Sequence, residues 1–268
     1  FNLMLGQVNA SHMGLFRGEN QKQTQNDRTG MLGVELQPVA GGLRVSSVLP
    51  KSPAARIESQ LEVNDVITAV NQQPVANLNL YSLLNNQADQ PVLLDVMRGD
   101  EAKEVVIWPT DSLSSALYDD WVETRRALTE EYSKGKLGYL HIRGMNWSSF
   151  ERFERELMAA GYGKEGIVID VRYNGGGWTT DYLMAVLNVK QHAYTIPRGA
   201  AKNLEKEHKK FRSEYPYSER LPLSAWTKPS IAMSNEASYS NAEIFSHAYK
   251  NLGIGKLVNN FVDSIHPV

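Results

Sequence analysis

The amino-acid sequence predicts an α/β fold with an inserted small β-rich domain. Between residues 137 and 252, apolar runs typical of buried strands alternate with helical patterns, which indicates a layered α/β domain with a largely parallel sheet. Between residues 31 and 109, short strand patterns alternate with turn signals. With 268 residues, the chain is long enough for two domains of ordinary size.

Each domain has its own series of expected elements. The β-rich domain should hold strands at residues 32–36, 43–48, 66–70, 92–97 and 104–108, with one helix near 79–86. The α/β domain should hold helices near residues 113–132, 148–161, 181–187, 202–212 and 242–252, and strands near 137–142, 167–169, 231–233 and 255–257. The helix at 202–212 is highly charged, which is typical of a solvated surface helix.

The N-terminal region is expected to lie outside both domains. Residues 17–30 contain no large apolar residue and are interpreted as a mobile linker. The predicted organisation is therefore an N-terminal segment with this linker at 1–28, a β-rich domain at 29–109 and an α/β domain at 110–268. Because the chain opens at Phe1 within an apolar pattern, we expect it to begin inside a longer polypeptide.

Composition excludes several classes of function. A formal net charge of -2 gives no field that would recruit nucleic acid or an anionic membrane. The absence of cysteine excludes disulfides, a thiol nucleophile and a zinc–thiolate site. No apolar run approaches the length of about 20 residues that a membrane-spanning helix needs. No metal or cofactor is expected.

A serine-rich turn between a strand and a helix is the most informative chemical feature. The apolar run at residues 231–233 ends at Ser234, and the chain then passes through Ser238 and Ser240 into the helical pattern that Gly253 closes. A serine at this point lies at the positive end of the helix, where a developing negative charge is stabilised. Ser240 is favoured over Ser238 as a nucleophile because it stands directly before the helical run.

A glycine triplet, Gly175 to Gly177, follows the strand pattern at residues 167–169. Three glycines permit unusual backbone dihedrals and a close approach of substrate to bare amides, so these amides could face a reacting carbonyl. A phosphate-binding loop is excluded because no Gly-Lys-Ser/Thr sequence follows. A flexible turn without function is the alternative interpretation.

The β-rich domain resembles PDZ domains of the kind found with bacterial proteases. The residues that carry the resemblance are Thr29-Gly30-Met31-Leu32-Gly33-Val34, Ser52-Pro53-Ala54-Ala55 and the run from Leu61 to Asn71. The resemblance implies that the loop with Met31, Leu32, Gly33 and Val34 binds the terminal carboxylate of a peptide and that the following strand is the docking edge. An unrelated small β-barrel is the alternative.

The whole chain resembles the C-terminal half of tricorn-type serine peptidases, which are related to the C-terminal-processing, tail-specific peptidases. Five ordered segments carry this resemblance: Gly6 to His12, the PDZ-like module, Leu137 to Ile142, Ile169 to Gly177 and Asn235 to Phe245. It implies a crotonase/ClpP-like α/β catalytic domain with an inserted PDZ-like domain. It also implies that homo-oligomers can form, and it favours the cytoplasm over the periplasm.

The resemblance implies a role for each matching residue. Ser240 corresponds to the nucleophile, His12 to the general base and Ser11 to a neighbouring member of the tetrad, whereas the Gly177 and Asn241 amides correspond to oxyanion-hole donors.

Other residues are candidates for the base and the acid. His247 lies about two helical turns from Ser240, too far to be its base, and is interpreted as structural. A Ser-Lys dyad is unsupported because position 265 is Ile265 and the nearest downstream lysine is Lys256. The acid of the tetrad is not recognisable after Val258; Asp263 is a candidate.

Three functional hypotheses follow. The leading one is a serine peptidase acting on oligopeptides or unfolded proteins, with peptides as its partners and no cofactor. The second is a catalytically inactive peptide-binding protein of the same fold. The third is an enzyme acting on acyl-CoA esters with the crotonase-like architecture.

Overall fold

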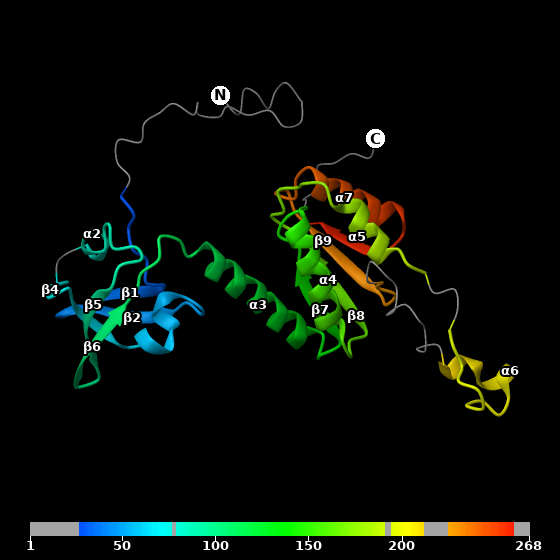
Figure 1. Cartoon of the computed structure of the whole chain (residues 1–268), viewed down its shortest axis with the longest axis horizontal. Helices are drawn as coiled ribbons and strands as arrows, with labels where there is room; N and C mark the ends of the chain where they lie inside the picture. The colour runs from blue at the N-terminus through cyan, green and yellow to red at the C-terminus, as the bar shows by residue number, and fades with distance from the viewer. Residues whose placement is uncertain (1–26, 77–78, 191–193, 212–224, 260–268) are drawn as a thin grey trace, which may run out of the picture. The chain divides into compact units, whose positions relative to one another are not determined.

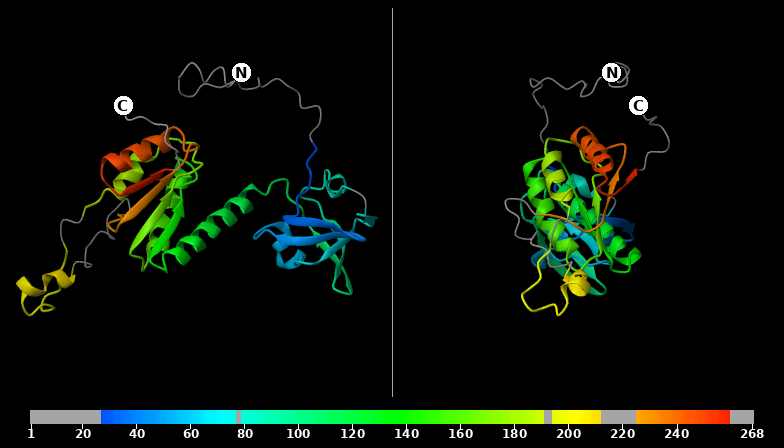
Figure 2. Two further views of the ribbon diagram at one scale, coloured as in Figure 1. Left: turned by 180° about the vertical axis from the view of Figure 1, so that it is seen from behind. Right: turned by 90° about the vertical axis from the view of Figure 1, so that its right-hand side faces the viewer.

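The computed structural model describes residues 27–76, 79–190, 194–211 and 225–259. The chain divides into two compact units, Phe1–Tyr118 and Asp119–Val268 (Figure 1). Helix α3 (Ser114–Tyr132) begins in the first unit, ends in the second, and is one uninterrupted helix (Figure 2). Among the described residues, no helix has the length and apolar character needed to cross a bilayer.

The first unit is an antiparallel sheet with one short helix beside it. Its strands follow the spatial order β1-β2-β3-β5-β6, and β4 pairs with β3. They are β1 (Val34–Val39), β2 (Gly42–Val48), β3 (Val66–Val70), β4 (Gln73–Pro74), β5 (Val92–Arg98) and β6 (Glu101–Ile107). Two 3-10 helices, Pro53–Ala55 and Ile57–Ser59, connect β2 to β3. Five of these strands match the sequence prediction; the two-residue β4 was not predicted.

The core of this sheet is made by β-branched and leucine side chains at alternate strand positions. Along β5, Val92, Leu94 and Val96 are buried, while the residues between them are more exposed. Helix α2 (Leu80–Leu83) closes the core and is capped by the Asn79 side chain, which accepts a hydrogen bond from Tyr81 N at 3.1 Å. The prediction of a longer helix was wrong, because Asn86 adopts a positive φ of 57° that turns the chain out of the helix.

The end of the predicted linker is held in place, which corrects the interpretation of residues 28–30 as mobile. Arg28 forms ion pairs with Asp89 at 2.8 Å and Asp111 at 2.6 Å, and Gly30 N donates to Leu84 O at 2.8 Å. A sequence without large apolar residues can therefore be ordered by polar contacts. The predicted linker residues 17–26 lie outside the described residues.

The second unit is a four-stranded sheet in which every pair of neighbouring strands is parallel, as predicted. The spatial order is β10-β9-β8-β7. The strands are β7 (Leu137–His141), β8 (Gly166–Asp170), β9 (Ser230–Ser234) and β10 (Lys256–Asn259). The helices packed on it are α4 (Trp147–Gly161), α5 (Thr180–Leu187) and α7 (Asn241–Asn251).

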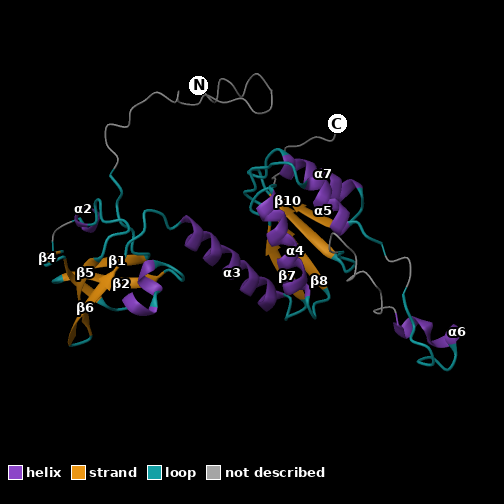
Figure 3. Ribbon diagram, in the orientation of Figure 1, coloured by secondary structure: helices purple, strands orange, loops and turns teal. Residues whose placement is uncertain are grey.

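One face of this sheet is apolar and carries these helices. Leu140, Ile169 and Ala232 lie side by side in the strand register, so they point to the same face. They share one buried cluster with Phe153 and Leu157 of α4 and with side chains of α5 and α7. Figure 3 shows α4, α5 and α7 lying over the strands. The carboxyl ends of the strands therefore meet the beginnings of the helices at one edge of the sheet.

The opposite face carries a buried polar cluster. Asp170 is fully buried; it accepts a hydrogen bond from Tyr139 Oη at 2.7 Å and pairs with Arg172 at 2.6 Å. His141 Nε2 lies 2.8 Å from Arg172 O, and the Trp121 ring of α3 packs edge-on against His141 with centroids 4.8 Å apart. Helix α3 thus covers polar side chains whose hydrogen bonds are satisfied within the cluster.

The charged segment after α5 forms less helix than predicted. Helix α6 (Leu204–Glu207) begins after Asn203, whose side chain accepts a hydrogen bond from Lys206 N at 3.2 Å, and a 3-10 turn follows at His208–Phe211. Leu204 is 60% exposed, so this short helix has no buried face to stabilise it.

The close packing of β7 on α4 gives a stability prediction. A methyl group at Gly138 would lie 2.2 Å from Ala160 O, a backbone atom that cannot move without distorting α4. Gly138→Ala should therefore lower the free energy of unfolding by about 1–3 kcal/mol in urea denaturation. Gly175→Ala is the matched control, because no atom lies within 4 Å of a methyl group there. Equal stability of the two variants would contradict this packing argument.

Candidate functional site

Ser240 occupies a strained turn between β9 and α7. It is the N-cap of α7 and has φ 56° and ψ −118°, a conformation that is unusual for a residue with a side chain. Its backbone N–H donates to Glu243 Oε2 at 2.6 Å, so the first turn of α7 holds it. A serine in a sharp turn between a strand and a helix is displayed in the way that serine hydrolases display their nucleophile.

The glycine loop after β8 lies directly against this serine. A methyl group built on Gly176 would lie 2.7 Å from Ser240 Cβ and 3.0 Å from Asn241 N. Gly177 has φ 144°, and a methyl group there would lie 1.9 Å from Met145 O. Only glycine fits at these two positions, because any side chain would push the loop away from Ser240.

Two backbone amides beside Ser240 are available as donors. Among the described residues, neither Gly177 N nor Asn241 N donates a hydrogen bond. The groups around them are paired: Met145 N donates to Gly176 O at 2.9 Å, and Trp178 N donates to Met145 O at 2.7 Å. The structure therefore brings together three of the predicted catalytic-site residues, Ser240, Gly177 and Asn241.

Asn174 connects the three segments that form this site. Its side chain is fully buried, donates from Nδ2 to Ile142 O at 2.8 Å and accepts from Gly176 N at 2.9 Å. Its carbonyl oxygen accepts from Tyr239 N at 2.9 Å. The end of β7, the glycine loop and the serine turn are thus fixed to one side chain and its backbone.

A second buried amide, Asn235, holds the start of the serine turn. Asn235 Oδ1 accepts from Tyr173 N at 3.1 Å. Ser238 is 8% exposed; its Oγ donates to Val171 O at 2.8 Å and accepts from Asn235 N at 3.0 Å. Because the Ser238 hydroxyl is buried and bonded within the turn, it is a structural group.

The Asn241 side chain joins the N-terminal ends of two helices. Asn241 Oδ1 accepts from Thr180 N at 3.0 Å, and Thr180 Oγ1 donates to Asn241 O at 2.8 Å. The start of α5 is therefore fixed to the start of α7. This contact keeps the glycine loop, which leads into α5, beside Ser240.

The other histidines near the sheet are bound in structural contacts. Burial lowers the pKa of His141, while the hydrogen bond to Arg172 O opposes this shift, so the ring is neutral near pH 7. His247 lies on the exposed side of α7, where its Nε2 is 2.7 Å from Asn251 Nδ2. The hydrogen bond to Asp170 raises the pKa of Arg172.

Three residues with a predicted role, His12, Ser11 and Asp263, lie outside the described residues.

Sequence reasoning missed Asn174, Asn235 and Thr180 as organisers of this site. The sequence contained a signal for the two asparagines. Asn174 and Asn235 follow the buried strands β8 and β9, which are neighbours in the sheet. Polar residues that follow adjacent parallel strands meet at the same edge of the sheet.

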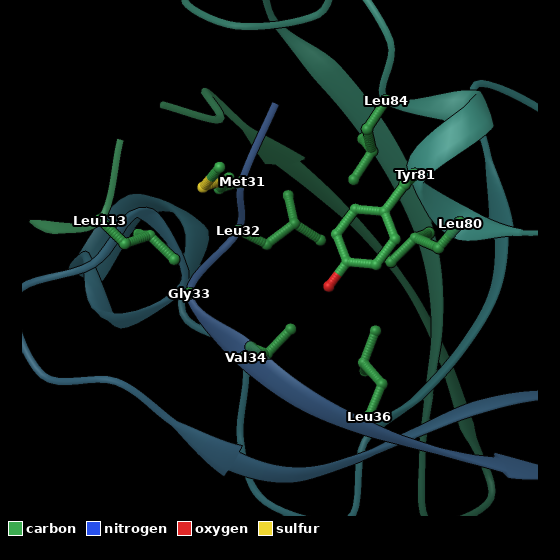
Figure 4. A pocket seen from close by; sticks show the side chains of 9 residues that line it. All are labelled: Met31, Leu32, Gly33, Val34, Leu36, Leu80, Tyr81, Leu84 and Leu113. Carbon is green, nitrogen blue, oxygen red and sulfur yellow. The ribbon is translucent and has the colours of Figure 1, made fainter. Parts of the chain in front are cut away.

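A second candidate site lies in the first unit, between β1 and α2. It is an apolar cavity of about 330 Å³ lined by Met31, Leu32, Gly33, Val34, Leu36, Leu80, Tyr81, Leu84 and Leu113. Figure 4 shows Tyr81 projecting from α2 across this cavity toward the strand side. The four residues of the predicted peptide-binding loop therefore form one wall of a real cavity.

The loop at the end of this cavity depends on Gly33. Gly33 has φ 84°, and a methyl group there would lie 2.2 Å from Ser52 Cβ. Gly33 O accepts from Leu49 N at 2.8 Å, which fixes the turn. Among the described residues, the Leu32 and Gly33 amides have no hydrogen-bond acceptor, so both are available to an anionic group.

Comparison with known proteins finds a matching family for each of the two units. Residues 136–260 match the model of peptidase family S41, and residues 30–107 match the PDZ domain model. The chain is 32% identical over 211 residues to the "Tricorn protease homolog" of Saccharolobus solfataricus, covering 78% of this chain and 18% of that protein. It is 32% identical over 243 residues to "Tricorn protease homolog 1" of Streptomyces coelicolor, covering 86% of this chain and 21% of that protein.

A solved structure supports the same assignment. The fold matches the crystal structure of the tricorn protease with a TM-score of 0.67 and 26% identity, over 86% of this chain and 22% of that one. The chain spans about a fifth of the length of the curated relatives it matches. It carries a PDZ domain followed by a domain that matches peptidase family S41, and it is similar to tricorn proteases over most of its length.

Proposed function

We propose that this chain carries the catalytic site of a serine peptidase that hydrolyses peptide bonds in oligopeptides or unfolded proteins through an acyl-enzyme on Ser240. The observation that carries the proposal is the strained Ser240 turn, held against a glycine loop with two backbone amides available beside it. Such a pair of fixed donors favours the negatively charged oxygen that forms when a hydroxyl attacks a carbonyl.

The proposed chemistry has two steps. Ser240 Oγ attacks the carbonyl carbon of the scissile bond, and His12 takes its proton and delivers it to the departing amine, which leaves an ester on Ser240. Water then attacks this ester; His12 takes a proton from the water and returns one to Ser240 Oγ as the peptide acid leaves. In both steps the Gly177 and Asn241 amides donate to the oxyanion. Ser11 is assigned a supporting place beside His12.

The proposed role of the first unit is to dock a peptide C-terminus. The Leu32 and Gly33 amides would donate hydrogen bonds to the terminal carboxylate, and the last side chain would enter the apolar cavity. Strand β1 is at the edge of its sheet, so the peptide backbone can add to it as a further strand. This unit would thereby hold a substrate chain by its end.

A catalytically inactive peptide-binding protein is the competing function, and labelling of Ser240 separates the two. In the full-length protein, a fluorophosphonate probe should label Ser240, and Ser240→Ala should abolish labelling and lower peptide cleavage by on the order of 10⁴-fold or more. Ser246→Ala, on the same helix, is the matched control and should be labelled normally. An unaltered protein that neither reacts with the probe nor cleaves peptides would contradict the proposal.

The general base is tested by comparing two histidines. His12→Ala should lower kcat by about 10²–10⁴-fold, because no group would then take the proton from Ser240. His247→Ala should keep full activity, because His247 lies about two helical turns beyond Ser240 and its side chain contacts Asn251. Equal activity of His12→Ala and the unaltered protein, measured by steady-state peptide cleavage, would remove His12 from the mechanism.

Asn174 should act as a positioning residue. Asn174→Ala leaves the Ile142 carbonyl and the Gly176 amide without partners, at a cost of about 1–3 kcal/mol each, and releases the glycine loop. We expect kcat to fall by about 10²-fold with little change in KM. Tyr249→Phe is the control, since it removes another buried hydrogen bond, to Ser230 Oγ at 2.6 Å, away from the site. Similar kcat losses in both variants would mean that lower stability alone explains the effect.

Binding at the first unit is tested with peptides that end in a large apolar residue. Tyr81→Ala should weaken binding by about 3–10-fold, because Tyr81 lines the cavity yet is 62% exposed and contributes little to folding. Amidation of the peptide terminus should abolish binding, as measured by fluorescence anisotropy. Val63→Ala, at an exposed residue outside the cavity, is the control. Equal affinity for free and amidated peptides would exclude carboxylate recognition.

A further inference from the structure

Three half-exposed aromatic side chains lie together beside the proposed oxyanion hole. They are Trp147 at the start of α4, Trp178 directly after the glycine loop and Tyr182 in α5, with exposed fractions of 45%, 56% and 40%. We call these three residues the aromatic ledge. Nothing in the proposed chemistry uses them.

The ledge is a fixed surface. The Trp147 and Trp178 rings are parallel within 5° with centroids 6.2 Å apart, and the Tyr182 ring meets both edge-on at 5.6 Å and 5.9 Å. Trp147 also packs on the buried Phe150, with centroids 5.3 Å apart. These contacts restrain the rings before any ligand arrives, so a ligand that packs on them loses little by ordering them.

The backbone places the ledge next to both proposed oxyanion donors. Trp178 follows Gly177 directly, and consecutive Cα atoms are about 3.8 Å apart. The Trp178 amide is held by Met145 O at 2.7 Å. Thr180, between Trp178 and Tyr182, is bonded through its amide to Asn241 Oδ1 at 3.0 Å. We therefore expect the side chains that flank a peptide carbonyl held by the Gly177 and Asn241 amides to reach these rings.

We propose that the aromatic ledge selects an aromatic or large aliphatic side chain of the peptide next to the bond that is cleaved, with Trp178 as its principal contact. This inference rests on the proposed function. Packing a large apolar side chain on the rings removes apolar surface of both partners from water, and an aromatic side chain adds the favourable geometry of ring pairs. Selectivity of this kind between a large side chain and alanine is typically about 10–100-fold in kcat/KM.

The test uses the full-length protein and peptides that differ only at the positions flanking the cleaved bond, with Phe, Leu, Ala or Lys there. We expect the unaltered protein to prefer Phe and Leu over Ala by about 10-fold or more in kcat/KM. Trp178→Ala and Trp147→Leu should reduce this ratio to about 3-fold or less. Trp108→Ala is the matched control, because Trp108 is as exposed as Trp147, at 45%, and lies in the first unit.

The remaining outcomes overturn the inference in different ways. An unchanged ratio in Trp178→Ala, or the same change in Trp108→Ala, would exclude the ledge. A uniform loss of rate on all four peptides in Trp178→Ala would mean that Trp178 only supports the glycine loop. A preference of the unaltered protein for the Lys peptide would mean that the exposed carboxylate of Asp181 selects the substrate instead. A dimer that dissociates in Trp178→Ala with an unchanged ratio would make the ledge an interface between two copies of this chain.

Failure of the proposed function gives a separate result. If the unaltered protein cleaves no peptide and its Ser240 does not react with a fluorophosphonate, the peptidase assignment and the inference fall together. Normal labelling of Ser240 with a flat preference among the peptides would overturn the ledge alone.

Discussion

The geometry of the candidate catalytic site depends on the hydrogen bonds of one buried residue, Asn174. Its amide group and carbonyl oxygen reach segments that lie between 2 and 65 positions away in sequence, at Gly176, Ile142 and Tyr239. A buried amide satisfied in this way has one favourable orientation, because any other would leave polar groups unpaired in a dry interior. Ser240 and the glycine loop therefore keep their relative positions because both are fixed to the same residue.

The two faces of the parallel sheet contribute differently to the structure. One stabilises the unit by apolar burial, and the other orients the backbone that leads to the candidate site. The apolar face carries α4, α5 and α7 and supplies most of the buried apolar surface of this unit. The other face buries Asp170 with Tyr139 and Arg172, contacts that hold the chain as it leaves β8 toward Asn174. A buried ion pair of this kind is weak evidence for stability, since desolvation offsets much of its attraction, but its fixed geometry orients the backbone that follows it.

Local patterns in the sequence predicted most of the fold and part of the candidate site. Strand and helix periodicity found the parallel sheet, and the composition of the two loops drew attention to Ser240 and Gly177. The bonds of Asn174 and Asn235 were not predictable, because they join segments that are distant in sequence and their partners are set by the register of the strands. The short α2 and α6 were overestimated, since tertiary contacts and turn residues such as Asn86 end a helix before its periodic pattern does. The roles of His12 and Ser11 remain predictions.

Unusual backbone conformations concentrate in the two segments that form the candidate catalytic site, the loop after β8 and the turn before α7. Tyr173, Gly176, Gly177 and Ser240 all have positive φ, and for Tyr173 and Ser240 this carries a cost of about 1–3 kcal/mol each. Each strained residue donates its amide to a fixed acceptor: Tyr173 N to Asn235 Oδ1 and Ser240 N to Glu243 Oε2. Relaxing either residue would break that bond, and in the case of Tyr173 it would leave the amide of a buried asparagine without this partner. The strain persists because the buried hydrogen bonds around it allow no better arrangement, and the Gly177 and Asn241 amides are thereby held beside Ser240 before a substrate binds.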